Sequence, residues 1–281
     1  MKQLIIFTDL DGTLLDGSTY SFESAAEALN LVSKKHIPLV LCSSKTRTEI
    51  EHYRLLLKNN HPFISENGGG IFIPEGYMEI ESQYGITVNR IDKYQAIYLG
   101  FPYKKLREGI KFLKERGFSV KGFGDMTVEE ISGLTGLTEE ESIMAKQREF
   151  DEPFIFEESE ERLEALLELI QKTGFKLTKG NLYHLTGNTD KGRAVKILIE
   201  LYTKKFKDLY TIALGDSLND LPMLCNVDLP VVIGKQSNTL DPFINLPKLI
   251  VAAGIGPEGW NNAIREIVSK NINQHTDWIF E

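Results

Sequence analysis

The chain has little cysteine, no long apolar run and no excess of basic residues. Only two of its 281 residues are cysteine, Cys42 and Cys225, which is too few for a disulfide framework. This predicts a reduced, cytoplasmic protein, as does an N-terminus without the basic-then-apolar pattern of a secretory signal. No apolar stretch is long enough to span a bilayer, so no membrane partner is expected. The net charge of −8 argues against a nucleic-acid partner, although a local basic cluster can still hold an anionic small molecule.

Strand-like apolar runs alternate with helical patterns at both ends of the chain. Hydrophobic residues make up 42% and charged residues 26%, which is typical of a globular protein. The alternation predicts βαβ units, and hence an α/β fold with a Rossmann-like parallel-sheet core. The expected strands are residues 4–9, 37–42, 63–65, 209–214, 230–233 and 249–252, and the expected helices are residues 23–32, 46–58, 191–202 and 260–268.

The alternation is interrupted in the middle of the chain. Here we expect an α+β module with strands at 94–99 and 154–156, helices at 103–116 and 163–170, and a hairpin around 179–181. The sequence thus predicts a core domain of residues 1–83 and 188–281 with an inserted cap domain of residues 84–187. It leaves the oligomeric state open.

Two carboxylates follow the first expected strand. Residues 9–13 read DLDGT, directly after an apolar run. In an extended backbone residues i and i+2 share a face, so Asp9 and Asp11 can address one substrate at the strand end where α/β sheets bind ligands. Carboxylates this close repel unless a cation or substrate lies between them. The alternative is an ordinary acidic turn, since Asp-Gly is a common turn dipeptide.

Three more segments carry polar groups at comparable positions. Ser43 follows the second strand, Lys191 begins the helix after the insertion, and residues 215–220 read GDSLND after a later strand. Each has an ordinary explanation as well. Ser43 can be a strand-end serine with Ser44 competing for its role, Lys191 an exposed first-turn lysine, and residues 216–220 a capped turn. Their common position at strand ends or helix starts favours one shared site.

These four segments, in this order, resemble the four motifs of the haloacid-dehalogenase-type phosphatases, and residues 84–187 resemble the cap domain of that family. The resemblance implies hydrolysis of a phosphate monoester through an aspartyl-phosphate intermediate. Asp9 is then the nucleophile, and Asp11 the general acid and base. Ser43 hydrogen-bonds a phosphoryl oxygen, and Lys191 neutralises charge on the transferring group.

The same resemblance implies Mg²⁺ as the cofactor. The ion is held by the Asp9 carboxylate, the Asp11 backbone carbonyl and the Asp216 carboxylate, together with waters. Asn219 and Asp220 are expected to orient the metal-bound waters or Lys191 from outside the first layer of ligands. Four aspartates at one edge of a sheet repel one another without a cation, which independently favours a metal.

Further segments resemble the mannosyl-3-phosphoglycerate phosphatase branch of the family. They are residues 43–47 (SSKTR), 65–69 (SENGG), 145–154 (AKQREFDEPF) and 183–192 (YHLTGNTDKG). The resemblance implies a small anionic sugar-phosphate substrate, mannosyl-3-phosphoglycerate, split into mannosylglycerate and phosphate. The alternatives are a broader sugar-phosphate phosphatase that also takes glucosyl-3-phosphoglycerate, a phosphomutase, or a non-catalytic module that binds a sugar phosphate.

A substrate with a phosphate and a carboxylate needs a second cationic anchor besides Lys191. Arg148 in the expected cap is our candidate, because a guanidinium can bind a carboxylate through two hydrogen bonds. A salt bridge to Glu149 or Asp151 within the cap is the alternative. Residues 67 and 68 are also candidates, since Asn67 and Gly68 either donate to substrate oxygens or only form a turn.

Two weaker patterns receive no functional role. Residues 254–259 read GIGPEG, which matches a dinucleotide-binding glycine fingerprint. No strand follows to supply the acid that binds the ribose, so we interpret this segment as a tight strand-to-helix turn. The five histidines show no metal-ligand spacing.

Overall fold

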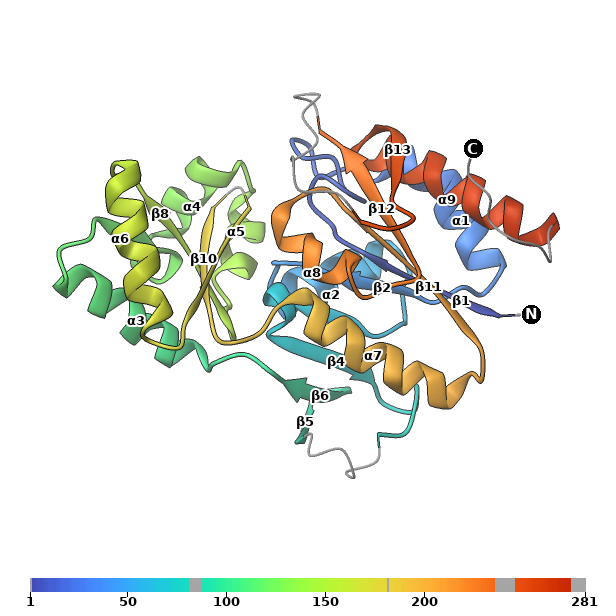
Figure 1. The fold of residues 1–281 in the computed structure, drawn as a ribbon, viewed down its shortest axis with the longest axis horizontal. Coiled ribbons are helices and arrows are strands. Elements are labelled where there is room, and N and C mark those ends of the chain that lie inside the picture. The colour runs from blue at the N-terminus through green and yellow to red at the C-terminus, as the bar shows by residue number, and fades with distance from the viewer. Residues whose placement is uncertain (1, 81–86, 181, 236–245, 274–281) are drawn as a thin grey trace.

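The computed structural model describes residues 2–80, 87–180, 182–235 and 246–273, and these form a core with one sheet and a cap with another (Figure 1). The core strands are β1 (Gln3–Thr8), β2 (Leu39–Cys42), β3 (Phe63–Ser65), β4 (Gly70–Pro74), β5 (Val88–Ile91), β6 (Tyr94–Tyr98), β11 (Leu209–Gly215), β12 (Leu229–Gly234) and β13 (Ile250–Ile255). Their order is β13-β12-β11-β1-β2-β3-β4-β6-β5. The strands from β13 to β3 are parallel, which confirms the predicted α/β class.

Helices cover both faces of the core sheet, because alternate residues of its strands point to opposite sides. Ile6 of β1 packs in one apolar cluster, and Ile5 and Phe7 pack in another on the opposite face. The first cluster includes residues of α1 (Ala26–Lys34), α2 (Arg47–Leu56) and α9 (Gly256–Asn273). The second includes residues of α7 (Lys191–Lys205) and α8 (Leu221–Leu224). The central strands are therefore buried on both faces, as their continuous apolar runs predict.

The cap is a four-stranded antiparallel sheet with helices on both faces. Its strands are β7 (Val120–Gly122), β8 (Asp151–Phe156), β9 (Lys176–Lys179) and β10 (Tyr183–Thr186), in the order β7-β8-β10-β9. One apolar cluster joins the sheet to α3 (Tyr103–Glu115) and α6 (Glu160–Gln171), and another joins it to α4 (Val128–Thr135) and α5 (Glu139–Ala145). The expected hairpin is present as β9 and β10, although residue 181 lies outside the described residues.

Two strands within the region that we expected to form the cap belong to the core sheet: β6, which matches the expected strand at 94–99, and β5, which we did not expect. Five residue pairs join β6 to β4, from Gly70 opposite Tyr98 to Pro74 opposite Tyr94, and β5 pairs with β6 in turn. The expected boundary at residue 84, itself outside the described residues, precedes both strands. The separate module begins after Tyr98. These antiparallel strands at the sheet edge lack the continuous apolar runs of the parallel strands, so their pattern resembles the insertion more than the core.

The last helix holds the backbone where β1 ends. Trp260 of α9 is fully buried, and its Nε1 donates to Thr8 Oγ1 at 3.0 Å. Thr8 Oγ1 in turn donates to the carbonyl oxygen of Asp9 at 2.8 Å. The expected starts of two helices agree with the structure. The Thr46 side chain caps α2, and the Asp190 side chain caps α7. No helix in the described part of the chain is both long and apolar enough to cross a membrane.

Adjacent leucines of α6 test the packing of the cap. Leu166 is fully buried, whereas Leu167 is 38% exposed. Leu166→Ala leaves a cavity between α6 and the cap sheet, so we expect it to lower the free energy of unfolding by about 2–5 kcal/mol. Leu167→Ala is the matched control and should cost less than about 1 kcal/mol. Urea unfolding followed by circular dichroism measures both. Equal losses would contradict this packing.

Candidate active site

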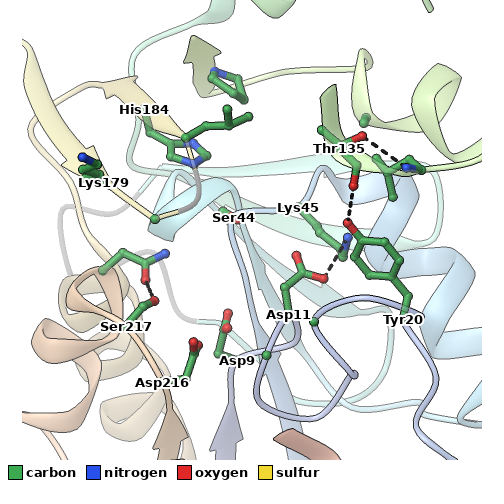
Figure 2. A pocket seen from close by; sticks show the side chains of 18 of the residues that line it. Asp9, Asp11, Tyr20, Ser44, Lys45, Thr135, Lys179, His184, Asp216 and Ser217 are labelled. Carbon is green, nitrogen blue, oxygen red and sulfur yellow. Dashed lines mark hydrogen bonds and ion pairs between the residues drawn. The ribbon is translucent and has the colours of Figure 1, made fainter. Parts of the chain in front are cut away.

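The register of β1 against β11 brings two predicted acidic residues together. Asp9 directly follows β1, and Asp216 directly follows β11. The strands pair in parallel with Thr8 opposite Leu214, and the Asp9 N–H donates to the Leu214 carbonyl at 2.9 Å. The Asp9 and Asp216 side chains both line one cleft (Figure 2). Residues from the two ends of the chain therefore form one site.

Lys191 lies between two carboxylates at the start of α7. Its Nζ donates to Asp9 Oδ1 and to Asp220 Oδ1, each at 2.6 Å. Burial disfavours the charged ammonium, but the Asp220 and Asp9 carboxylates together raise the pKa of Lys191 above its usual value. A cation in the first turn opposes the helix dipole, and these two anions compensate for it. The structure thus holds a charged lysine against the predicted nucleophile.

Asp220 fixes both Lys191 and the loop that carries Asp216. It ends the short 3-10 helix η5 (Leu218–Asp220) and is fully buried. Its Oδ1 accepts from Lys191, and its Oδ2 accepts from the N–H groups of Asp216 and Ser217, each at 3.0 Å. Because both oxygens are engaged, we assign Asp220 a supporting role and consider Asp9 and Asp216 the direct ligands for a metal.

The cluster of carboxylates fits a hard divalent cation. One oxygen from each of Asp9, Asp216 and Asp220 lies within 4.8 Å of the others. Burial, and then the charge of Asp220, raise the pKa of both Asp9 and Asp216, that of Asp216 to about 6. A divalent cation between them would relieve this repulsion, and carboxylate oxygens are the ligands that Mg²⁺ and Ca²⁺ prefer. These residues can therefore hold a metal.

Gly12 lets the backbone approach the metal-binding group. Its φ of +74° is left-handed, and a Cβ atom at this position would lie 3.0 Å from Asp216 Oδ2. The next residue, Thr13, donates from Oγ1 to Asp216 Oδ1 at 3.2 Å. The loop after β1 thus packs directly on the Asp216 carboxylate, which explains why glycine follows the two aspartates.

Asp11 has a partner to which we assigned no role from the sequence. Lys45 Nζ lies 3.1 Å from Asp11 Oδ1 and 3.5 Å from Glu49 Oε1 (Figure 2). The Lys45 side chain is 6% exposed and also faces the rings of Tyr20 and Tyr53. It therefore positions the predicted acid at the cleft. The only signal in the sequence was its place in the SSKTR segment after a strand.

The two serines after β2 occupy different surroundings. Ser43 is fully buried, and its hydroxyl oxygen accepts from the N–H of Lys45 at 3.2 Å. Ser44 lines the cleft. The role of Ser43 as a donor to a phosphoryl oxygen stays a prediction, and Ser44 remains its competitor.

The cleft lies between the core and the cap and measures about 760 Å³. The core side is lined by Asp9, Asp11 and Asp216, by Lys45, and by Lys235, whose Nζ lies 3.6 Å from Asp216 Oδ2. On the cap side the polar lining residues include Thr135, Arg148, Lys179 and His184. A molecule bound at Asp9 therefore extends toward side chains of the cap (Figure 2).

Arg148 links the cap to the core. Its Nε donates to the Ala145 carbonyl at 2.7 Å, and its Nη1 donates to the Ser44 carbonyl at 2.8 Å. Its Nη2 lies 3.8 Å from Glu49 Oε2, so its acidic neighbour is in the core. The two acidic residues that we considered as alternative partners of Arg148 pair with other residues. Glu149 pairs with Arg47, and Asp151 pairs with His184. Arg148 lines the cleft, and its role as a carboxylate anchor stays a prediction.

The turn after β3 is built into the same junction. The Asn67 side chain donates to Asp151 Oδ2 of the cap at 2.8 Å and accepts from Asn219 Nδ2 at 3.1 Å. Gly68 has a φ of +89°, and a Cβ atom there would lie 2.2 Å from the Asp190 carbonyl oxygen. Within the described part of the chain, Asn219 lines the cleft whereas Asn67 and Gly68 do not. The structure thus gives residues 67 and 68 a connecting role, and their direct contact with substrate stays a prediction.

Glu66 binds a cap segment through its carboxylate. The side chain is fully buried and accepts from three successive N–H groups, those of Glu149, Phe150 and Asp151, at 2.7–3.1 Å. Burial raises the pKa of Glu66 to about 8, against the opposing effects of Arg148 and these N–H groups. A buried core carboxylate therefore fixes the cap segment next to Arg148.

Comparison with known families identifies the chain. Residues 6–243 match the model of the haloacid dehalogenase-like hydrolase family. The chain belongs to this family. The match includes all four segments on which the resemblance rested, from the loop after β1 to the loop after β11.

Relatives within this hydrolase family match almost the whole chain. The glucosyl-3-phosphoglycerate/mannosyl-3-phosphoglycerate phosphatase of Methanococcoides burtonii is 48% identical over 271 residues, covering 96% of this chain and 98% of the relative. The mannosyl-3-phosphoglycerate phosphatase of Pyrococcus horikoshii is 37% identical over 251 residues, covering 88% and 98%. The predicted family and enzyme class, a phosphatase, are confirmed.

Solved structures share the arrangement of core and cap. A Thermoplasma acidophilum protein superposes with a TM-score of 0.68 at 19% identity, covering 95% of this chain and 99% of its own. At this identity the likeness concerns the fold alone. Both domains of this hydrolase therefore have a counterpart of known structure.

Substitutions around Asp216 test the metal site. Asp216→Asn removes a charge, and Gly12→Ala places a methyl group against the Asp216 carboxylate, so we expect each to weaken Mg²⁺ binding at least about tenfold. Gly17→Ala is the matched control, because its Cβ atom would meet only the Gly12 Cα at 3.9 Å. Titration calorimetry with Mg²⁺ measures the affinity directly. Unchanged affinity in both variants would contradict the site.

The raised pKa of Glu66 predicts a pH-dependent stability. Its pKa rises from 4.5 to about 8 on folding. Its contribution to the free energy of unfolding is therefore fully present below pH 4.5 and is lost as the pH rises through 8. Glu66→Gln lacks this titration. We therefore expect the wild type to lose stability relative to Glu66→Gln between pH 5 and 9, measured by urea unfolding. Glu75→Gln, at an exposed site, is the control. A constant difference across this range would show that Glu66 does not titrate there.

Proposed function

We propose that this phosphatase hydrolyses mannosyl-3-phosphoglycerate and glucosyl-3-phosphoglycerate, releasing phosphate and the glycosylglycerate, with Mg²⁺ as cofactor. The names of the relatives support the dual specificity, since the 48%-identical relative carries both substrates in its name. Our first expectation, the mannosyl compound alone, has less support than this alternative. The observation that carries the chemistry is the Asp9 carboxylate held 2.6 Å from the buried Lys191 ammonium at the end of β1.

The first step transfers the phosphoryl group to Asp9. An Asp9 oxygen attacks phosphorus while the bond from phosphorus to the glyceryl oxygen breaks, and Asp11 gives that oxygen a proton. Lys191 neutralises negative charge on the transferring group. Its ion pairs with Asp9 and Asp220 hold the ammonium beside the attacking carboxylate. Mg²⁺ bound by Asp9, Asp216 and the Asp11 carbonyl would add positive charge at the phosphoryl oxygens.

The second step releases phosphate. Asp11, now ionised, removes a proton from a water molecule that attacks phosphorus, and the bond to Asp9 breaks. Lys45 supports this exchange because its ammonium, 3.1 Å from Asp11 Oδ1, fixes the carboxylate at the cleft. Closure by the cap would exclude other water during the first step.

The cleft suits a substrate that carries two anionic groups. The buried Lys191 supplies positive charge beside Asp9, and Lys45, which lines the cleft, supplies it beside Asp11. Arg148, Lys179 and His184 line the cap side. In this proposal the phosphate binds at the core, and the sugar and carboxylate extend toward the cap. Arg148 fastens the cap over the substrate through the Ser44 carbonyl, and a substrate carboxylate would share its Nη2 with Glu49, 3.8 Å away.

Replacement of the nucleophile tests the reaction. Asp9→Asn keeps the shape of the side chain but cannot form the phosphoenzyme, so we expect kcat to fall at least about a thousandfold. Asp16→Asn is the matched control on the same loop, since Asp16 lines the cleft and its carboxylate caps only the turn at Ser18 and Thr19. Phosphate release from both glycosyl-3-phosphoglycerates and from p-nitrophenyl phosphate is measured.

The outcomes separate the reaction from the substrate. If Asp9→Asn keeps more than a tenth of the wild-type activity, the assignment of Asp9 as the nucleophile is wrong. If the wild type hydrolyses p-nitrophenyl phosphate with a kcat/KM as high as for the glycosyl-3-phosphoglycerates, the phosphatase chemistry stands and the proposed substrate is wrong.

A further inference from the structure

His184 is a buried histidine that reaches into the cleft from the cap strand β10. Its side chain is only 8% exposed, yet the residue lines the cleft (Figure 2). Nδ1 lies 2.8 Å and 3.1 Å from the two carboxylate oxygens of Asp151 on the neighbouring strand β8. An ionised carboxylate only accepts hydrogen bonds, so Nδ1 carries a proton and donates it. The ring orientation is thereby fixed through Nδ1.

The carboxylate that holds this ring is itself held in place. Asp151 is fully buried, and its Oδ2 also accepts from Asn67 Nδ2 of the core at 2.8 Å. The Asn67 oxygen accepts from Asn219 Nδ2, beside the loop of the predicted metal ligand Asp216. A chain of hydrogen bonds therefore runs from His184 in the cap to the catalytic loop of the core.

Other polar groups on the cap side of the cleft are less prepared to bind a ligand. Arg148 already uses Nε and Nη1 on backbone carbonyls, and Thr135 Oγ1 donates to the Ile131 carbonyl. Lys179 is exposed, and its Nζ contacts the Tyr183 hydroxyl at 3.2 Å. His184 combines burial, a fixed ring and a second nitrogen, Nε2, that takes no part in the Asp151 contacts.

We propose that His184 is a specificity residue whose Nε2 donates a hydrogen bond to the carboxylate of the substrate's glyceryl group. This inference rests on the proposed function, because that function supplies an anion besides the phosphate. The doubly protonated ring then lies between two carboxylates, Asp151 and the substrate, and makes a charge-assisted hydrogen bond to each. Lys191 serves the phosphate at the core, and His184 serves the second anion at the cap.

Two substitutions separate the two ring nitrogens. His184→Asn keeps an amide donor where Nδ1 contacts Asp151 but removes Nε2, whereas His184→Gln places an amide near Nε2. We expect His184→Asn to raise KM for the glycosyl-3-phosphoglycerates about 10- to 100-fold with a smaller change in kcat. The loss in kcat/KM should be at least tenfold larger than for p-nitrophenyl phosphate, which has no carboxylate. His184→Gln should recover part of the lost affinity.

His36→Asn is the matched control. His36 is exposed, and its φ of +52° is one that asparagine adopts readily, so this variant should behave as the wild type. Wild-type KM in His184→Asn, or equal losses for both substrates, would overturn the role of His184 while the proposed function stands. A wild type that does not prefer the glycosyl-3-phosphoglycerates would overturn both.

Discussion

The buried contact of Lys191 with Asp9 and Asp220 is the interaction on which the site depends. A fully buried ammonium needs paired anions, and here one anion is Asp9, the proposed nucleophile, and the other, Asp220, holds the loop of Asp216. Removing one carboxylate leaves Lys191 paired with the other, whereas removing Lys191 leaves two buried carboxylates without their cation, which is strongly destabilising. The same three groups therefore stabilise the junction of β1, α7 and β11 and prepare it for an anionic ligand.

One short segment of the cap makes both polar and apolar contacts with the core. Glu66 accepts from the N–H groups of Glu149, Phe150 and Asp151, and Arg148 donates back to the Ser44 carbonyl. The Asn67 amide adds a contact to Asp151. Replacing hydrogen bonds of this kind by hydrogen bonds to water costs little free energy, whereas exposing apolar surface of similar extent costs more. Phe150 of the same segment packs in the apolar cluster of the core and against Tyr98, so separation of the cap would also expose an apolar side chain.

The sequence predicts the parallel half of the core and the positions of Asp9, Lys191 and Asp216, because apolar runs and strand-end motifs are local signals. It does not predict that β5 and β6 join the core, since edge strands carry a half-polar pattern. The short strand β4 and the helices α4 and α5 were also missed. The contact of Lys45 with Asp11 depends on two loops meeting in space, which no local pattern encodes. For the same reason the acidic neighbour of Arg148 proved to be Glu49 of the core.

The central place of β1 has a consequence for the order in which the protein is made. β1 is synthesised before the cap, but its neighbour β11 and the helix with Trp260, which holds the backbone at Asp9, are synthesised after it. The cap strands and helices come from one continuous stretch between them. On the ribosome the cap therefore emerges whole while the core still lacks β11, β12 and β13, three of the nine strands of the described sheet. The contacts of Asp9 with β11 and, through Thr8, with Trp260 form only after α9 has emerged, so a shorter chain carries the proposed nucleophile without them.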